Sequence, residues 1–144
     1  MCLFTTQPNG TKRLSAPNQP PDKTEPHELE IAQWLIQNNI KFKWFRKYEG
    51  RKSPDIFIGE KSVELKTLLP PDGKFRYLSL EGKLLDASLQ SRRAIVDATQ
   101  TDLIESLAVE VLRKIIDELG SLFDELVILV STELGKLAVG WHRA

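Results

Sequence analysis

The amino-acid sequence predicts an α/β domain around a single mixed β-sheet flanked by helices, with elements in the order α-β-β-β-α-β-α-β-β. The length of 144 residues suits one domain with one core and is short for two. Apolar residues switch along the chain between helical spacing and strand-like alternation. The apolar runs at 94–96 (AIV) and 126–130 (LVILV) are nearly continuous, which is typical of central strands covered on both faces.

The first predicted helix spans about 25–38 and follows a flexible polar leader at 1–23. The leader contains four prolines among Gln, Asn, Thr and Ser residues and shows little apolar periodicity, so the folded domain is predicted to occupy 24–144. Thr24 is the expected helix cap. The apolar residues of the helix form one stripe, and Glu28 lies on the buried side.

The remaining elements follow from alternation, turn residues and helical spacing. Gly59 marks a turn between the second and third strands, and Gly120 ends a long helix with apolar residues at four-residue spacing. A stretch containing Gly and Pro, 70–82, separates the third strand from the second helix. The predicted strands are 41–48, 54–58, 62–69, 92–98, 125–131 and 136–143, and the further helices are 83–90 and 101–119.

Composition argues against several classes of protein. The formal net charge is zero, from 20 basic and 20 acidic residues, so contact with nucleic acid depends on local clustering of charge. The single Cys2 cannot form an internal disulfide, and with two histidines, His27 and His142, no cluster has the spacing of a zinc site. No apolar run approaches the roughly 18 residues of a membrane span, and the first residues lack the features of a signal peptide. These features predict a soluble protein without an export signal of its own.

The segment SPDIFIGEKSVELKTL (53–68) contains a candidate metal site. Two-residue spacing on a strand puts Glu64 and Lys66 on one face, and a hairpin through Gly59 brings Asp55 close to them. Two adjacent carboxylates repel unless a cation lies between them, and such hard oxygen ligands suit Mg²⁺ or Mn²⁺. A metal here can activate water for attack on a phosphate, and Lys66 can orient that water or stabilise the developing charge. The alternative is a solvated strand face with a cross-strand ion pair.

The acid-x-lysine pattern by itself carries little information, because the chain repeats it at Asp72-Gly73-Lys74 and Glu81-Gly82-Lys83. Both repeats have glycine in the middle and lie in the predicted turn-rich stretch, where no strand fixes the directions of their side chains. Only Glu64-Leu65-Lys66 lies in alternating apolar sequence and follows a Pro-Asp pair at the distance of a hairpin.

The order of elements around this motif resembles the restriction-endonuclease-like core of the PD-(D/E)xK nuclease superfamily. The resemblance is carried by the first helix, by the strands with Pro54-Asp55 and Glu64-Leu65-Lys66, and by the helix and strand that follow. The second half, with QSRRAIVD (90–97), the helix 101–119 and LFDELVILVSTELGKLAVGW, is similar to the tail of the C-terminal tRNA nuclease domains of contact-dependent inhibition toxins of the CdiA type. The resemblance covers about residues 25–144.

The resemblance implies that Asp55 and Glu64 ligate the metal together with the backbone carbonyl of Leu65, and that Lys66 is the catalytic lysine. Glu28 matches an additional acid that many members place on the first helix. The resemblance further implies Mg²⁺ (or Mn²⁺) as the cofactor and RNA, above all tRNA, as the substrate. It also implies action in the bacterial cytoplasm after delivery into a target cell, and a cognate immunity protein as a partner.

A basic patch at 41–52 is the predicted surface for a polyanion. Its net charge is +5, and aromatic residues interleave with the charges, a mixture that can hold phosphates and stack bases. The alternative is an edge strand whose lysines prevent aggregation and whose aromatic residues point into the core. Residues 101–126 carry a net charge of −5, so that face is expected to point away from nucleic acid. The candidate nucleic-acid-binding residues are Lys41, Lys43, Arg46, Lys47, Arg51, Lys52, Gln90 and Arg92.

Together these features predict a divalent-metal-dependent endonuclease that acts on RNA. Physical chemistry alone leads only to phosphodiester hydrolysis, and tRNA is favoured through the resemblance. Three alternatives are open. They are a DNA endonuclease of the restriction or repair type, a non-catalytic nucleic-acid-binding domain on the same fold, and a scaffold domain whose acids form cross-strand ion pairs.

Overall fold

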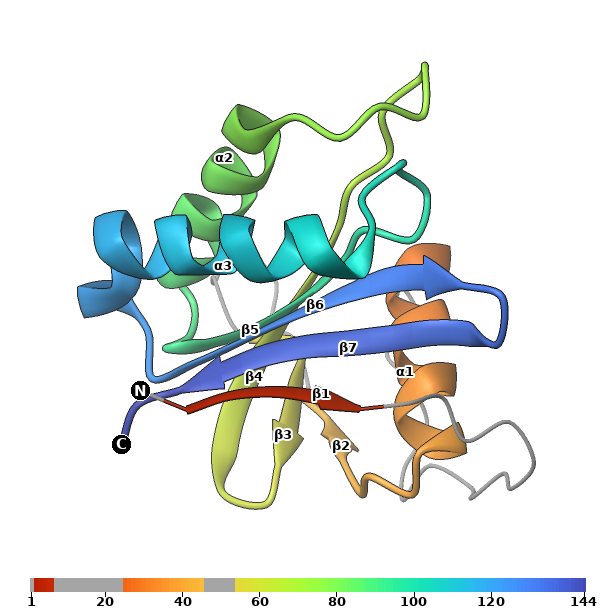
Figure 1. The fold of residues 1–144 in the computed structure, drawn as a ribbon. Coiled ribbons are helices and arrows are strands. Elements are labelled where there is room, and N and C mark those ends of the chain that lie inside the picture. Colours follow the sequence, from red (N-terminus) through yellow and green to blue (C-terminus); the bar gives the residue numbers. More distant parts are fainter. Residues whose placement is uncertain (1, 7–24, 46–53) are drawn as a thin grey trace.

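A seven-stranded β-sheet forms the centre of the computed structural model, which describes residues 2–6, 25–45 and 54–144 (Figure 1). The strands are β1 (Cys2–Thr6), β2 (Lys43–Trp44), β3 (Ile56–Ile58), β4 (Lys61–Thr67), β5 (Arg93–Asp97), β6 (Glu125–Thr132) and β7 (Gly135–His142). Across the described residues their order in the sheet is β1-β7-β6-β5-β4-β3-β2. β5 pairs in parallel with both β4 and β6, and the other neighbours are antiparallel. The predicted mixed sheet is therefore confirmed.

Helices cover both faces of this sheet. They are α1 (Pro26–Gln37), α2 (Tyr77–Ser88) and α3 (Glu105–Leu119), and a short 3₁₀ helix (Gly120–Leu122) follows α3. Figure 1 shows α1 apart from α2 and α3. The predicted order α-β-β-β-α-β-α-β-β is confirmed for the region after β1, as is the general α/β class.

Alternation along the central strands gives the molecule two hydrophobic cores. On β5, Ile95 packs with the residues of α1, whereas Ala94 and Val96 pack with those of α2 and α3. On β6, Val127 and Ile128 divide between the two cores in the same way. The prediction that these apolar runs are covered on both faces is confirmed, because successive side chains of a strand point to opposite faces and a continuous apolar run therefore presents apolar residues to both cores.

The first residues of the chain differ from the prediction of a leader at 1–23 outside the fold. Residues 2–6 form β1, which pairs with β7 from Cys2 opposite His142 to Thr6 opposite Ala138. Without β1, the outer backbone N–H and C=O groups of β7 would lie at an edge, and an extended segment satisfies them. Residues 7–24, including the expected cap Thr24, lie outside the described residues, and Glu25 is the N-cap of α1.

The second helix begins earlier than predicted, at Tyr77 instead of residue 83. Leu80, Leu84 and Ala87 are spaced for one helix face and are at most 1% exposed. Their burial outweighs the cost of about 1 kcal/mol that Gly82 imposes in a helix interior. None of the helices in the described part of the chain has the length and apolar content that crossing a membrane requires.

Candidate active site

The β3–β4 hairpin brings Asp55 and Glu64 to opposed positions. Ile56 pairs with Val63, so the next pair along the two antiparallel strands is Asp55 and Glu64. The connecting turn uses Gly59 at φ +63°, a left-handed conformation that glycine adopts without steric cost. The hairpin geometry expected from the sequence is therefore present, and it aligns two acids that are nine positions apart in the chain.

Both acids are buried in the structure, with exposed fractions of 2% for Asp55 and 3% for Glu64. The backbone N–H of Leu65 donates a hydrogen bond of 2.8 Å to Asp55 Oδ2, which fixes the Asp55 carboxylate against β4. In a strand the N–H and C=O of one residue are directed to the same side. The Leu65 carbonyl is therefore directed to the same edge of β4 as the Asp55 carboxylate.

Lys66 brings a positive charge to this pair. Its ammonium lies 3.5 Å from Glu64 Oε2 and also forms a short ion pair with Asp86, which is on α2. Partial burial by itself lowers the pKa of Lys66, but the hydrogen bond to Asp86 and the charges of Glu64, Asp86 and Asp55 outweigh burial and raise this pKa above its ordinary value. Lys66 is therefore protonated throughout the neutral range.

Strand alternation separates these charged groups from the core under α1. Val63 and Leu65 belong to the α1 core, whereas Ala94, which pairs with Glu64, belongs to the core under α2 and α3. Glu64 and Lys66 therefore face α2. This explains why Asp86, on α2, reaches Lys66, a contact that no local sequence pattern indicates.

Glu28 lies on a different element and has a different contact. It is the third residue of α1 and is 8% exposed, and the backbone N–H of Glu25 donates to its Oε2 at 3.3 Å. This contact is half of a capping box, which satisfies an amide at the start of the helix. Among the described residues there is no group of three or more acid, histidine or cysteine side chains that could hold a metal ion. The structure thus brings Asp55, Glu64 and Lys66 together, and a role of Glu28 in the site stays a prediction.

The carboxylates of Asp55 and Glu64 still fit a divalent ion with oxygen ligands. Mg²⁺ is commonly bound through one or two carboxylates, with its other positions filled by water and substrate phosphates. Two opposed carboxylates and a backbone carbonyl on the same strand edge meet that requirement. A site with four protein ligands is not required for this chemistry.

The basic patch is described only in part. Lys41 and Lys43 are exposed, whereas Phe42 and Trp44, at 2% and 7% exposed, are buried in the core under α1. These two aromatic residues are therefore core residues of an edge strand and not stacking platforms. The other candidates of the patch, Arg46, Lys47, Arg51 and Lys52, lie outside the described residues.

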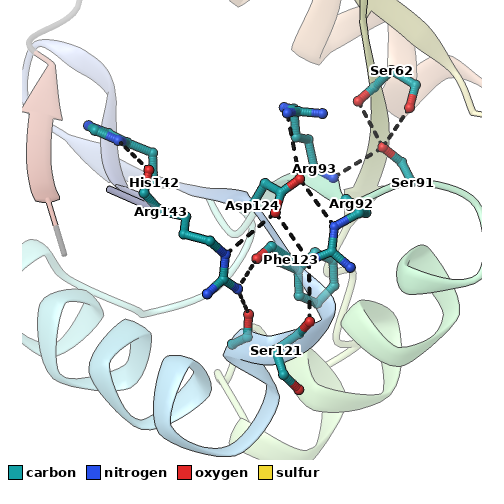
Figure 2. Close-up of polar contacts among 10 residues, drawn as sticks. Ser62, Ser91, Arg92, Arg93, Ser121, Phe123, Asp124, His142 and Arg143 are labelled. Carbon is teal, nitrogen blue, oxygen red and sulfur yellow. Dashed lines mark hydrogen bonds and ion pairs between the residues drawn. The ribbon is translucent and has the colours of Figure 1, made fainter.

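Arg92 lies in a separate polar cluster at the amino ends of β5 and β6 (Figure 2). Its guanidinium donates two hydrogen bonds of 3.1 Å to the carboxylate of Asp124, and Arg93 and Arg143 also pair with Asp124. The hydrogen bond of Arg92 to Asp124 and, after it, the negative charge of Asp124 raise the pKa of Arg92. Gln90 follows α2, with its backbone N–H bonded to the carbonyl of Ala87. A role of Gln90 or Arg92 in nucleic-acid binding stays a prediction.

Comparison of the chain with protein families, with curated proteins and with solved structures gives no match. The resemblance to PD-(D/E)xK nucleases therefore stays a prediction. It depends on the motif and on the order of the elements.

Proposed function

We propose that this chain is a divalent-metal-dependent endonuclease that hydrolyses phosphodiester bonds of RNA on a restriction-endonuclease-like core of the PD-(D/E)xK type. The observation that carries the proposal is the buried pair of Asp55 and Glu64 beside the Lys66 ammonium. Burial of two neighbouring carboxylates costs free energy, because each loses hydration and the two repel each other. A site that binds a cation explains why a fold would hold both acids there.

Each residue has a distinct part in the proposed chemistry. Asp55, Glu64 and the Leu65 carbonyl would hold Mg²⁺ or Mn²⁺, which when bound supplies a Lewis acid for the phosphate group. The protonated Lys66 is suited to stabilise negative charge on the phosphate oxygens and not to accept a proton from water. Asp86 is a positioning residue, because it holds the Lys66 ammonium from the side of α2.

The choice of substrate is supported by surface charge and by the family resemblance. Lys43 is on β2 and Lys41 lies two residues before it, and both are exposed. β2 pairs with β3, the strand that begins directly after Asp55, so these lysines can attract a polyanion to the site. The preference for tRNA, action in the bacterial cytoplasm and a cognate immunity protein belong to this proposal through the resemblance alone. A DNA substrate is the alternative outcome of the test below.

The test is incubation of the purified protein with total RNA and with plasmid DNA, in the presence of Mg²⁺, Mn²⁺ or EDTA. We expect cleavage of RNA that depends on the metal and is lost in Glu64→Gln, with an unchanged circular dichroism spectrum. Cleavage of the plasmid alone would move the proposal to a DNA endonuclease. If neither substrate is cut, the ion pair of Lys66 with Asp86 favours a structural role for the cluster, and the nuclease proposal fails.

A further inference from the structure

A second polar site lies beyond the carboxyl end of β4, between the first turns of α1 and α2. It is a pocket of about 280 Å³ lined on the α2 side by Lys74, Arg76 and Lys83 and on the α1 side by His27. Among the described residues, this lining contains three basic side chains besides His27 and no acidic one. Such a one-signed concave surface concentrates anions, because low-dielectric walls strengthen the field of the charges that line it.

The two lysines differ from Arg76 in their contacts. Arg76 donates to Asp72 through both terminal nitrogens, and this pair lowers the pKa of Asp72 to about 2. For Lys74 and Lys83 the described part of the chain provides no ion-pair partner. The pocket therefore offers two uncompensated ammonium groups, whereas the arginines of Figure 2 share the carboxylate of Asp124.

A residue that lines the pocket carries a buried hydroxyl group without a hydrogen-bond partner among the described residues. Thr67 lines the pocket and is 5% exposed, and its Oγ1 has no hydrogen-bond partner among the described residues. A buried hydroxyl without a partner costs about 1–3 kcal/mol. The hydroxyl is out of contact with solvent, so a rotation of the Thr67 side chain toward the pocket would be needed for a phosphate oxygen to accept from it and remove that cost.

The pocket is connected to the candidate active site through two elements. Thr67 follows Lys66 on β4, although the side chains of neighbouring strand residues point to opposite faces. Lys83 is three residues before Asp86 on α2, so their Cβ atoms lie about 5–6 Å apart on one helix face. An RNA segment with one phosphate at Lys66 would therefore pass close to Lys83. We infer that this pocket is a subsite for a neighbouring phosphate of a single-stranded RNA segment. The inference rests on the proposed function for the identity of the ligand.

The first experiment measures binding without cleavage. The probe is a fluorescent 2′-O-methyl RNA 12-mer in EDTA, titrated at several salt concentrations with the parent chain and with Lys74→Gln/Lys83→Gln. We expect at least tenfold weaker binding by the double variant, and a salt slope smaller by about 0.7 for one lost phosphate contact on a single strand. Lys61→Gln/Arg113→Gln is the matched control, because it also removes two positive charges from exposed residues that do not line the pocket.

The second experiment uses Thr67→Val, which keeps the shape of the side chain and removes the hydroxyl. We expect this variant to be at least as stable as the parent in urea denaturation, because the buried hydroxyl has no partner to lose. We also expect weaker binding of the 12-mer with an unchanged salt slope, because no charge is removed. A merely structural role for Thr67 would not weaken RNA binding in a stable variant.

The outcomes separate this inference from the proposed nuclease. If the parent chain cleaves RNA and the double lysine variant keeps both its affinity and its salt slope, the subsite is refuted and the nuclease stands. If the lysine and threonine variants lose RNA affinity but the parent chain cuts neither RNA nor DNA, the nuclease fails and the phosphate pocket holds. Binding of polyglutamate that is lost in the double lysine variant, with no RNA binding by the parent chain, would assign the pocket to an acidic protein partner and overturn the inference.

Discussion

Stabilisation by Mg²⁺ should depend on Glu64 and not on an equivalent charge elsewhere on the hairpin. Asp55 and Glu64 are brought into register only by the folded hairpin, and they are 2% and 3% exposed. The unfolded chain therefore lacks the site, and a metal that binds it adds RT ln(1 + [L]/Kd) to the free energy of unfolding. We expect a higher melting temperature in Mg²⁺ for the parent chain and no such shift for Glu64→Gln.

The size of the shift follows from the length of the chain. At a Mg²⁺ concentration ten times Kd, the linkage contributes about 1.4 kcal/mol. For 144 residues the unfolding entropy is about 0.3 kcal/mol/K, so the melting temperature should rise by about 5 °C. Because the formal net charge is zero, general screening by the salt should be small.

Differential scanning calorimetry with 0–20 mM MgCl₂ at constant ionic strength measures this shift. Glu60→Gln is the control, since Glu60 is an exposed residue of the β3–β4 turn and the substitution removes the same charge. The reasoning is refuted if the parent chain shows no shift over this range, or if Glu64→Gln shifts as much as Glu60→Gln.

Three further predictions concern the charged groups and one helix. Because the pKa of Lys66 is raised above 10.5, its contribution to stability is complete below that pH and is lost as pH rises through the folded-state pKa. The stability difference between the parent chain and Lys66→Met in urea denaturation should therefore stay constant from pH 6 to 9 and shrink above pH 10.5. Lys136→Met should lower the free energy of unfolding by about 3 kcal/mol, because it leaves Asp97, which is 0% exposed, without the ammonium now 2.6 Å from its Oδ2. An undiminished urea midpoint would contradict that estimate. Gly82→Ala should raise the free energy of unfolding by about 0.5–1 kcal/mol, because an added Cβ has no heavy atom within 4 Å in the interior of α2. A lower thermal midpoint for this variant would show that Gly82 serves another purpose.

The candidate site was predictable where one local pattern decides the geometry. Alternation on a strand directs Glu64 and Lys66 to the same face, and the turn at Gly59 sets the register that brings Asp55 opposite Glu64. The identity of the other partner of Lys66 was not predictable. Asp86 is twenty residues from Lys66 along the chain, on α2. The glycines and prolines at 70–82 led to a predicted start of this helix at residue 83 instead of Tyr77.

Glu28 shows the limit of a helical pattern. Its spacing correctly indicates the buried side of α1, but burial alone does not decide whether a carboxylate meets a metal site or the start of its own helix. The repeated acid-x-lysine patterns at 72–74 and 81–83 show the same limit. Neither reproduces the strand motif, yet the fold brings Lys74 and Lys83 to one pocket.

Sequence alone determined the α/β class, the order of the elements after residue 25 and the shared face of the acid and lysine on β4. These properties depend on residue spacing along a single helix, strand or hairpin. Tertiary structure decided which groups from different elements meet, including β1 beside β7, Asp86 beside Lys66 and the basic pocket next to Thr67. Such contacts depend on how separate elements pack across the sheet, which no periodicity within one element records.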